Sequence, residues 1–282
     1  MAEPKILVTT PNGKVGQEVV KLLLEARAPV RVAAHTLERG QEAFPGAEVA
    51  VLDYEDPATF APALEGVAAL YLASPATSQA DPELALIDAA QAGGVQRVVK
   101  LSAMGVESAP DEVPLRAVEK RLQGSGLQWT LLRPTWFMQN FVTLHAPSIQ
   151  GGTLLEPAGE SRLAFIDARD IAAVAVQALT SDGHHGQAYA LTGPELLGRQ
   201  DVAERIGRVL GKDIRYRSCS DQEFHQLMRP YLPESYIQLL LALYADLRSG
   251  GDGPVTQDVR KVLGRPPIPF DQFARDHREA WA

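Results

Sequence analysis

Apolar segments that alternate with helical segments constrain the fold of this chain more than any other feature. Residues 5–9 are short and mainly apolar, and the "AALYLA" segment at 68–73 is apolar throughout, as expected of a strand covered on both faces. The segment after the first strand carries an apolar stripe at helical spacing, made of Val15, Val19, Leu22 and Leu23. Strands that alternate with helices predict βαβ units, and hence an α/β fold with a doubly wound parallel sheet.

The same reading extends over the whole chain. Further strands are expected at 30–34, 48–52, 97–102, 128–132, 164–166 and 187–191. Further helices are expected at 82–92, 115–123, 172–179, 199–210, 221–228 and 234–247. We therefore expect a nucleotide-binding domain over residues 1–150, followed by a mixed segment, 151–282, that completes the sheet and forms a smaller, mostly helical substrate lobe.

The turn after the first strand has the residues of a phosphate-binding turn. A dinucleotide turn reads G-x-x-G-x-x-G here, and "VTTPNGKVG" keeps the second and third glycines, Gly13 and Gly16, with Thr10 at the first position. Backbone N–H groups at the start of the following helix attract a pyrophosphate. The residues expected around it are Thr10, Asn12, Gly13, Lys14, Val15 and Gly16. The alternative is an ordinary strand-to-helix loop.

The end of the second strand bears on the choice of cofactor. An acidic residue there usually binds the ribose 2′-OH of NAD, whereas a basic residue accommodates the 2′-phosphate of NADP. The segment "RVAAHTLERG" offers His35 and Arg39 instead of an acid. We therefore expect NADP(H), with NAD(H) as the alternative. If the residues have no role in binding, His35 is a solvated loop histidine and Arg39 an arginine at a helix start.

Composition excludes several other classes of protein. The net charge of -8 argues against a nucleic-acid partner, because such binding needs a basic surface. No apolar run reaches the roughly 20 residues that a membrane span needs. The first five residues lack the blocks of a signal peptide, and Cys219 is the single cysteine, so we expect a cytoplasmic protein. The oligomeric state is not readable.

At this point the sequence resembles the NmrA-like, atypical short-chain dehydrogenase/reductase family. The resemblance rests on segments in family order: "VTTPNGKVG", "VLDYEDPATFAPALEGVAALYLASP", "VVKLSAMGV", "EKRLQGSGLQWTLLRPTWFMQNF", "FIDARDIAAVA" and "GQAYALTGPE". The later "VTQDVRKVLGRPPIPFDQFARDH" is similar to the branch with agroclavine-dehydrogenase-like and triphenylmethane-reductase-like proteins. The resemblance implies a Rossmann fold, NAD(P) binding and a variable C-terminal substrate lobe.

The resemblance also implies roles for individual residues. Asp53 and Tyr54 match the pair expected near the adenine. Ala73, Ser74 and Pro75 match a strand end that lies along the cofactor, and Ser102 matches the serine near the nicotinamide. Residues 134–137, which include Pro134 and Phe137, match the loop that closes over the nicotinamide. Met104, Trp136 and Asn140 are the residues we expect to contact a small-molecule substrate.

The chain departs from the family where the proton-transfer machinery is expected. Typical members use a Tyr-x-x-x-Lys pair, and many NmrA-like members keep a lysine or histidine four residues before the glutamate that matches Glu119. That position is Leu115 here, with Arg116 next, and leucine cannot exchange a proton. Ser102 is left as the candidate catalytic residue.

Other candidate residues have mainly structural interpretations. We expect Asp167 and Asp170 to support the start of a helix, a position that favours short acidic side chains. His145 is a weak candidate for a proton relay, and Cys219 is expected to be inert. No metal site is expected, because His184 and His185 lack a matching ligand cluster.

Three functions remain open at this point. The first is an NADPH-dependent reductase of a small, flat, conjugated, quinone-like or iminium substrate, since such a substrate delocalises the incoming charge and needs little help from a protein acid. The second is a non-catalytic NADP(H) sensor that regulates a protein partner. The third is a cyclase or isomerase without net redox change.

Overall fold

The computed structural model describes residues 5–75, 79–250 and 252–282. Residues 1–4, where no signal peptide is expected, lie outside the described residues. The chain forms two compact units that alternate along the sequence. Unit 1 comprises residues 1–134, 168–191 and 261–264, and unit 2 comprises residues 135–167, 192–260 and 265–282. Within the described part of the chain, no helix is long and apolar enough to cross a membrane.

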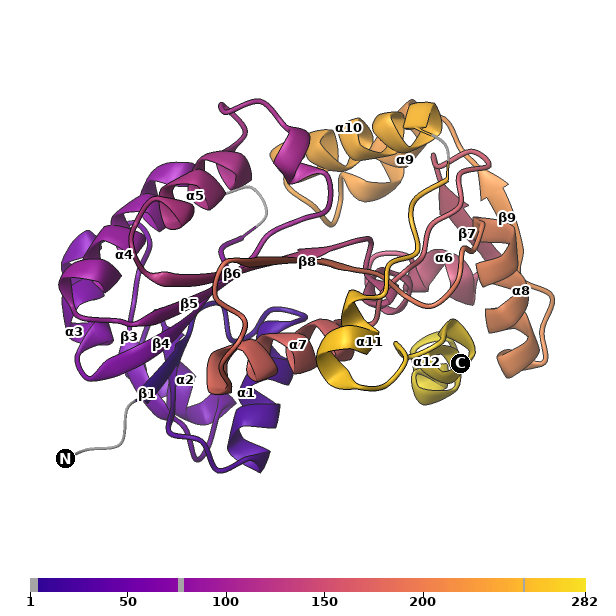
Figure 1. Ribbon diagram of the computed structural model, residues 1–282. Helices are drawn as coiled ribbons and strands as arrows, with labels where there is room; N and C mark the ends of the chain where they lie inside the picture. Colours follow the sequence, from indigo (N-terminus) through magenta and orange to yellow (C-terminus); the bar gives the residue numbers. More distant parts are fainter. Residues whose placement is uncertain (1–4, 76–78, 251) are drawn as a thin grey trace. The chain divides into compact units, whose positions relative to one another are not determined.

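Unit 1 is built on a seven-stranded sheet whose neighbouring strands all pair in parallel (Figure 1). Its strand order is β3-β2-β1-β4-β5-β6-β8. The strands are β1 (Lys5–Val8), β2 (Val30–Ala34), β3 (Glu48–Val51), β4 (Val67–Leu72), β5 (Arg97–Leu101), β6 (Gln128–Pro134) and β8 (Gln187–Leu191). The order reverses between β1 and β4, the point at which doubly wound sheets bind their ligands.

Helices cover both faces of this sheet, which confirms the predicted Rossmann-type α/β fold (Figure 1). One face carries α1 (Gly16–Glu25), α2 (Leu37–Ala43) and α7 (Ala168–Thr180), and the other carries α3 (Phe60–Leu64), α4 (Ala80–Ala92) and α5 (Pro114–Gln123). Val19 and Leu23 of the predicted stripe are fully buried. Short 3₁₀ turns lie at η1 (Pro57–Thr59) and η2 (Val106–Ser108).

Unit 2 is mostly helical and contains a small parallel sheet of two strands, β7 (Thr153–Glu156) and β9 (Arg215–Ser218). Its helices are α6 (Ala146–Gln150), α8 (Arg199–Leu210), α9 (Asp221–Met228), α10 (Glu234–Gly250) and α12 (Phe270–Asp276), with 3₁₀ turns η3 (Met138–Val142) and η4 (Arg278–Trp281). The chain passes from unit 2 to unit 1 within α11 (Asp258–Leu263). The core of unit 2 combines aliphatic and aromatic side chains, and the buried Trp281 Nε1 donates to the Phe141 carbonyl at 2.8 Å.

The predicted strand at 164–166 is wrong. Ala164, Phe165 and Ile166 are buried, but the segment forms only isolated bridges, Leu163 with Leu197 and Phe137 with Ile166. Burial explains the apolar run, because a segment enclosed by helices must be apolar whether or not it joins a continuous ladder. The sequence analysis also missed β7 and β9, which are short and partly polar.

Candidate functional site

The turn after β1 has an unusual backbone at Thr10. Thr10 has a φ of 46°, in the left-handed region that a β-branched residue rarely adopts. Its carbonyl accepts the Gly13 N–H at 3.0 Å, which closes the turn. A Cβ on Gly16 would clash with the same carbonyl, so only glycine fits there. The turn has therefore kept the conformation of a glycine turn without its first glycine.

The start of α1 suits an anion. Val15 occupies the N-cap, and its side chain has no acceptor for the first N–H groups of the helix. Asn12 and Gly13 are exposed, whereas Val15 and Gly16 are buried, so the outer part of the turn is accessible. Burial lowers the pKa of the Lys14 ammonium, which a neighbouring phosphate would offset. The residues present thus fit a pyrophosphate.

The ends of β2 and β3 bring together two predicted cofactor residues. His35 Nδ1 lies 3.8 Å from Asp53 Oδ2, and the His35 side chain is 75% exposed. Arg39 is exposed in the first turn of α2, where its backbone N–H donates to the N-cap Thr36. Tyr54 donates its hydroxyl to the Ala73 carbonyl at 2.7 Å, and burial raises the pKa of its phenol well above the ordinary value. The Tyr54 hydroxyl is therefore a structural donor and not an acid.

Thr9 ties the end of β1 to the end of β4. Its Oγ1 accepts the Ala73 N–H at 2.8 Å and lies within hydrogen-bond distance of the Tyr71 and Ala73 carbonyls. Ser74 is half-buried and Pro75 is exposed directly beyond this tie. Thr9 fixes the spacing between the two strands that flank the reversal of the sheet order.

A buried hydrogen-bonded chain lies at the ends of β5 and β6. Ser102 Oγ donates to Glu119 Oε1 at 2.6 Å. Arg133 donates to both oxygens of the same carboxylate, from Nε at 2.9 Å and from Nη2 at 2.7 Å. The Met104 N–H donates to the Pro134 carbonyl at 3.1 Å, which joins the loop after β5 to the last residue of β6. Leu115, at the start of α5, is half-buried.

The remaining predicted residues belong to unit 2. Phe137, Trp136 and Asn140 are half-buried, and the Trp136 ring lies 4.8 Å from the Tyr244 ring. Asn140 donates its N–H to the Phe137 carbonyl at 3.1 Å. The other candidates belong to unit 1, where they lie at one edge of the sheet, and these three belong to unit 2.

Buried polar groups in unit 2 explain His145 without a relay. His145 Nε2 lies 3.1 Å from Glu156 Oε1 and 3.4 Å from the Tyr244 hydroxyl, and the histidine is almost fully buried. Glu156 also accepts from Arg199 Nε at 3.0 Å, and the Arg199 guanidinium lies 5.1 Å from the Phe165 ring centroid. These contacts hold the core of unit 2.

The other polar candidates are also built into the structure. Helix α7 begins directly after Asp167, whose carboxylate accepts from Gln139 Nε2 at 2.8 Å, and both Asp167 and Asp170 are fully buried. Burial raises the pKa of the Cys219 thiol to about 11, so the thiol is protonated at neutral pH. Within residues 5–75, 79–250 and 252–282, no group of three His, Cys, Asp or Glu side chains is arranged to hold a metal ion.

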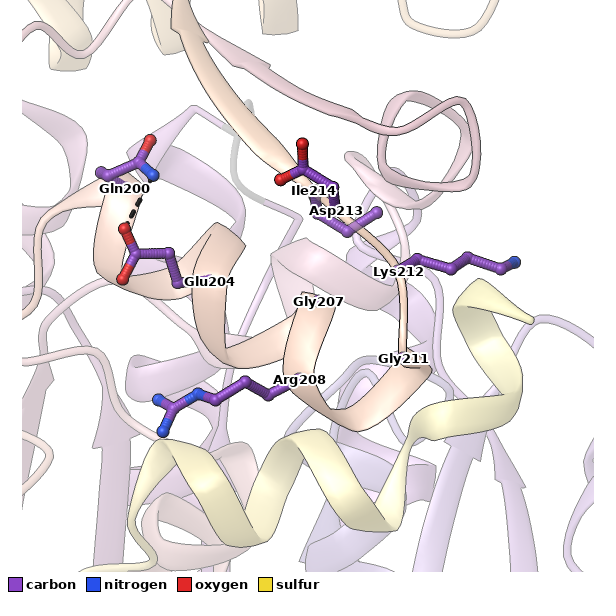
Figure 2. Close-up of a pocket in the computed structure, with 8 residues that line it drawn as sticks. All are labelled: Gln200, Glu204, Gly207, Arg208, Gly211, Lys212, Asp213 and Ile214. Carbon is purple, nitrogen blue, oxygen red and sulfur yellow. Dashed lines mark hydrogen bonds between the residues drawn. The ribbon is translucent and has the colours of Figure 1, made fainter.

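One surface hollow, of about 610 Å³, is lined by none of these residues. It is lined in unit 2 by α8 and the turn that follows, from Gln200 to Ile214 (Figure 2). Figure 2 shows the Gln200 amide bonded to Glu204 along one rim, at 2.9 Å. It is an open hollow with polar rims, so its volume alone does not mark a site.

Sequence reasoning missed the residues that connect the site. Glu119 was used only as an alignment marker, and Thr9 and Arg133 were not considered. The hydrogen bonds join positions 102, 119 and 133. An acidic residue in one predicted element and a basic residue in the next was the signal that the sequence offered.

Comparisons with known proteins identify the family of the chain. The NAD(P)H-binding family matches residues 11–182. The NAD(P)H azoreductase of Xenophilus azovorans is 36% identical over 284 residues, covering 98% of this chain and 99% of that protein. Agroclavine dehydrogenase of Claviceps fusiformis is 32% identical over 294 residues, covering 98% of each chain.

A solved structure extends the likeness to three dimensions. The NADPH-dependent quinone oxidoreductase of Escherichia coli, crystallised with NADPH, has a TM-score of 0.85 at 25% identity and covers 96% of this chain and 99% of that one. The resemblance inferred from the sequence is thereby confirmed. The chain belongs to the NAD(P)H-binding family and, within it, to the NAD(P)H-dependent oxidoreductases.

Proposed function

We propose that this protein is an NADPH-dependent reductase that delivers hydride to a small, flat substrate of conjugated, quinone-like or iminium type. The observation that carries the proposal is Leu115, an apolar side chain at the position where the family resemblance implies a lysine or histidine. Such a site suits acceptors that hold the incoming electron pair without immediate protonation. Three similar proteins are named as an azoreductase, an agroclavine dehydrogenase and a quinone oxidoreductase. These names support an acceptor of this type.

We assign the residues at the carboxyl edge of the unit 1 sheet to the cofactor. The turn from Thr10 to Gly16 would hold the pyrophosphate, and His35 with Arg39 would hold the 2′-phosphate. Asp53 and Tyr54 would lie near the adenine, and residues 73–75 would lie along the cofactor. Ser102, Pro134 and Phe137 would lie near the nicotinamide, with Met104, Trp136 and Asn140 toward the substrate. Bound NADPH supplies the hydride, and water supplies the proton that a reduced quinone needs.

The test is NADPH fluorescence and absorbance with the purified protein, before and after addition of quinones, iminium salts and enones. Binding followed by cofactor oxidation with one class supports the reductase and selects its acceptor. Binding without oxidation across the panel contradicts the reductase and favours an NADP(H) sensor or a non-redox enzyme. A Gly16→Ala variant is the control for cofactor binding, because its Cβ clashes with Thr10.

Cofactor choice has its own test. The His35→Asp, Arg39→Ala double variant should weaken NADPH relative to NADH by about tenfold or more, since it replaces a basic site by an acidic one. Lys21→Ala, which removes a positive charge from the exposed side of α1, should leave the ratio unchanged. An unchanged ratio in the double variant would contradict the assignment of the 2′-phosphate.

A further inference from the structure

Neighbouring residues decide whether the Ser102 hydroxyl acts as a hydrogen-bond donor or acceptor toward a further group. Glu119 is fully buried, and a carboxylate only accepts hydrogen bonds. The Ser102 Oγ to Glu119 Oε1 distance of 2.6 Å is in the range of charge-assisted O–H···O⁻ bonds. Since a serine hydroxyl has one proton, Ser102 has only its lone pairs left for any other group.

Arg133 keeps the carboxylate in this orientation. Its Nε and Nη2 groups bind the two oxygens of Glu119 separately, a forked arrangement that prevents the carboxylate from turning. Hydrogen bonding to Glu119 raises the pKa of the Arg133 guanidinium, so the clamp stays charged. Arg116 Nη1 adds a second positive group 3.6 Å from Glu119 Oε2.

The strand order places this chain of residues on the nicotinamide side. In a doubly wound sheet the dinucleotide crosses the point where the order reverses, which here lies between β1 and β4. The residues assigned to the pyrophosphate and the 2′-phosphate follow β1 and β2. The nicotinamide half of the cofactor would therefore extend toward β4, β5 and β6. Ser102 directly follows β5, and Arg133 lies near the end of β6.

We infer that Glu119, clamped by Arg133, is a positioning residue that fixes Ser102 as a hydrogen-bond acceptor for the carboxamide NH₂ of the nicotinamide. The inference rests on the proposed function, because it requires the cofactor in this site. It changes the role of Ser102 from a candidate catalytic residue to a group that orients the ring. It also removes Ser102 as a donor to a carbonyl oxygen, which favours acceptors that need no proton from the protein.

The experiment compares the affinities for NADPH and for its reduced 3-acetylpyridine analogue, in which a methyl group replaces the carboxamide NH₂. Wild-type protein should bind NADPH about five- to tenfold more tightly than the analogue, the usual effect of one hydrogen bond. Ser102→Ala should bring the two affinities close together, and Ser102→Thr should restore the difference. The readout is a ratio of dissociation constants, so it does not depend on a known substrate.

Glu119→Gln tests the positioning role. A glutamine amide places its NH₂ donor against Arg133 Nη2 or, when turned over, against Ser102 Oγ and Arg133 Nε. Either orientation breaks the clamp or removes the acceptor that holds the Ser102 proton, so the ratio should fall. Glu107→Gln is the matched control, because Glu107 lies 3.5 Å from Arg133 Nη1 and is largely exposed. Its ratio should equal that of the wild type.

The outcomes separate the two proposals. Failure of the wild-type protein to bind NADPH would contradict the proposed function. Normal NADPH binding with an unchanged ratio in Ser102→Ala would overturn only the acceptor role of Ser102. A collapsed ratio in Ser102→Ala with an unchanged ratio in Glu119→Gln would overturn the positioning role of Glu119.

Discussion

Thr10 shows at the scale of one residue how a phosphate turn can survive the loss of a glycine. An L-residue in the left-handed region costs roughly 1–2 kcal/mol, and the rest of the turn must supply it. We predict that Thr10→Gly raises the free energy of unfolding by about 1 kcal/mol, because glycine adopts this backbone conformation without strain. Denaturant unfolding measures the difference.

The control for this prediction is Arg27→Gly. Arg27 also has a positive φ, 56°, but follows the end of α1 and lies outside the turn. It should give a similar gain in stability. A loss of stability in Thr10→Gly together with a gain in Arg27→Gly would show that the Thr10 side chain stabilises the turn.

Lys14 gives a prediction about pH. Burial lowers its pKa in the free protein, and a bound pyrophosphate would raise that pKa again. Binding therefore takes up a proton in the pH range between the two pKa values. NADPH affinity should fall as pH rises through the lowered pKa of Lys14, and titrations at several pH values measure this slope.

The matched variants are Lys14→Met and Lys21→Met. The first variant should weaken NADPH binding and remove most of the fall in affinity with rising pH. The second changes a lysine on the exposed side of α1 and should keep the slope. A slope that persists in Lys14→Met would assign it to another group.

At the scale of elements, a buried ion pair joins β5 to α4. Lys100 Nζ lies 2.7 Å from Glu83 Oε1, and the two side chains are 1% and 3% exposed. Lys100→Met alone leaves a buried carboxylate without its charge partner, which should cost about 3–5 kcal/mol of unfolding free energy. The double variant Lys100→Met, Glu83→Leu should recover most of that loss in denaturant unfolding.

A double variant as unstable as the single one would mean that the pair is specifically needed. The pair Arg97–Asp182, at 2.8 Å and with a fully exposed aspartate, is the control at the other end of β5. Asp182→Asn should change the free energy of unfolding by less than about 1 kcal/mol, because exposed ion pairs contribute little.

The predicted elements differ in how local their evidence was. The elements at 30–34, 187–191, 199–210 and 221–228 have the predicted bounds. The residue pattern within each of these segments was sufficient to set its bounds. The small sheet of β7 and β9 had no such signal, since each strand has only the other as its partner.

At the scale of the whole molecule, cofactor binding should be visible as stability. A ligand that binds only the folded state adds about 2.7 kcal/mol at a concentration of 100 times Kd. NADPH should therefore raise the unfolding midpoint more than NADH does at equal concentration. Thermal unfolding measures this, and Gly16→Ala should show no shift with either cofactor. An equal shift in Gly16→Ala would place the cofactor outside the predicted turn.

The sequence by itself determined the strands of the doubly wound sheet and the family, because these depend on periodicity and motifs within short segments. Tertiary structure decided the hydrogen bonds of Ser102, Glu119 and Arg133. The Ser102 hydroxyl donates to a carboxylate 17 residues away, and Arg133 binds the same carboxylate from 14 residues further along the chain. Such contacts form only when separate elements pack together, so no local pattern of residues encodes them.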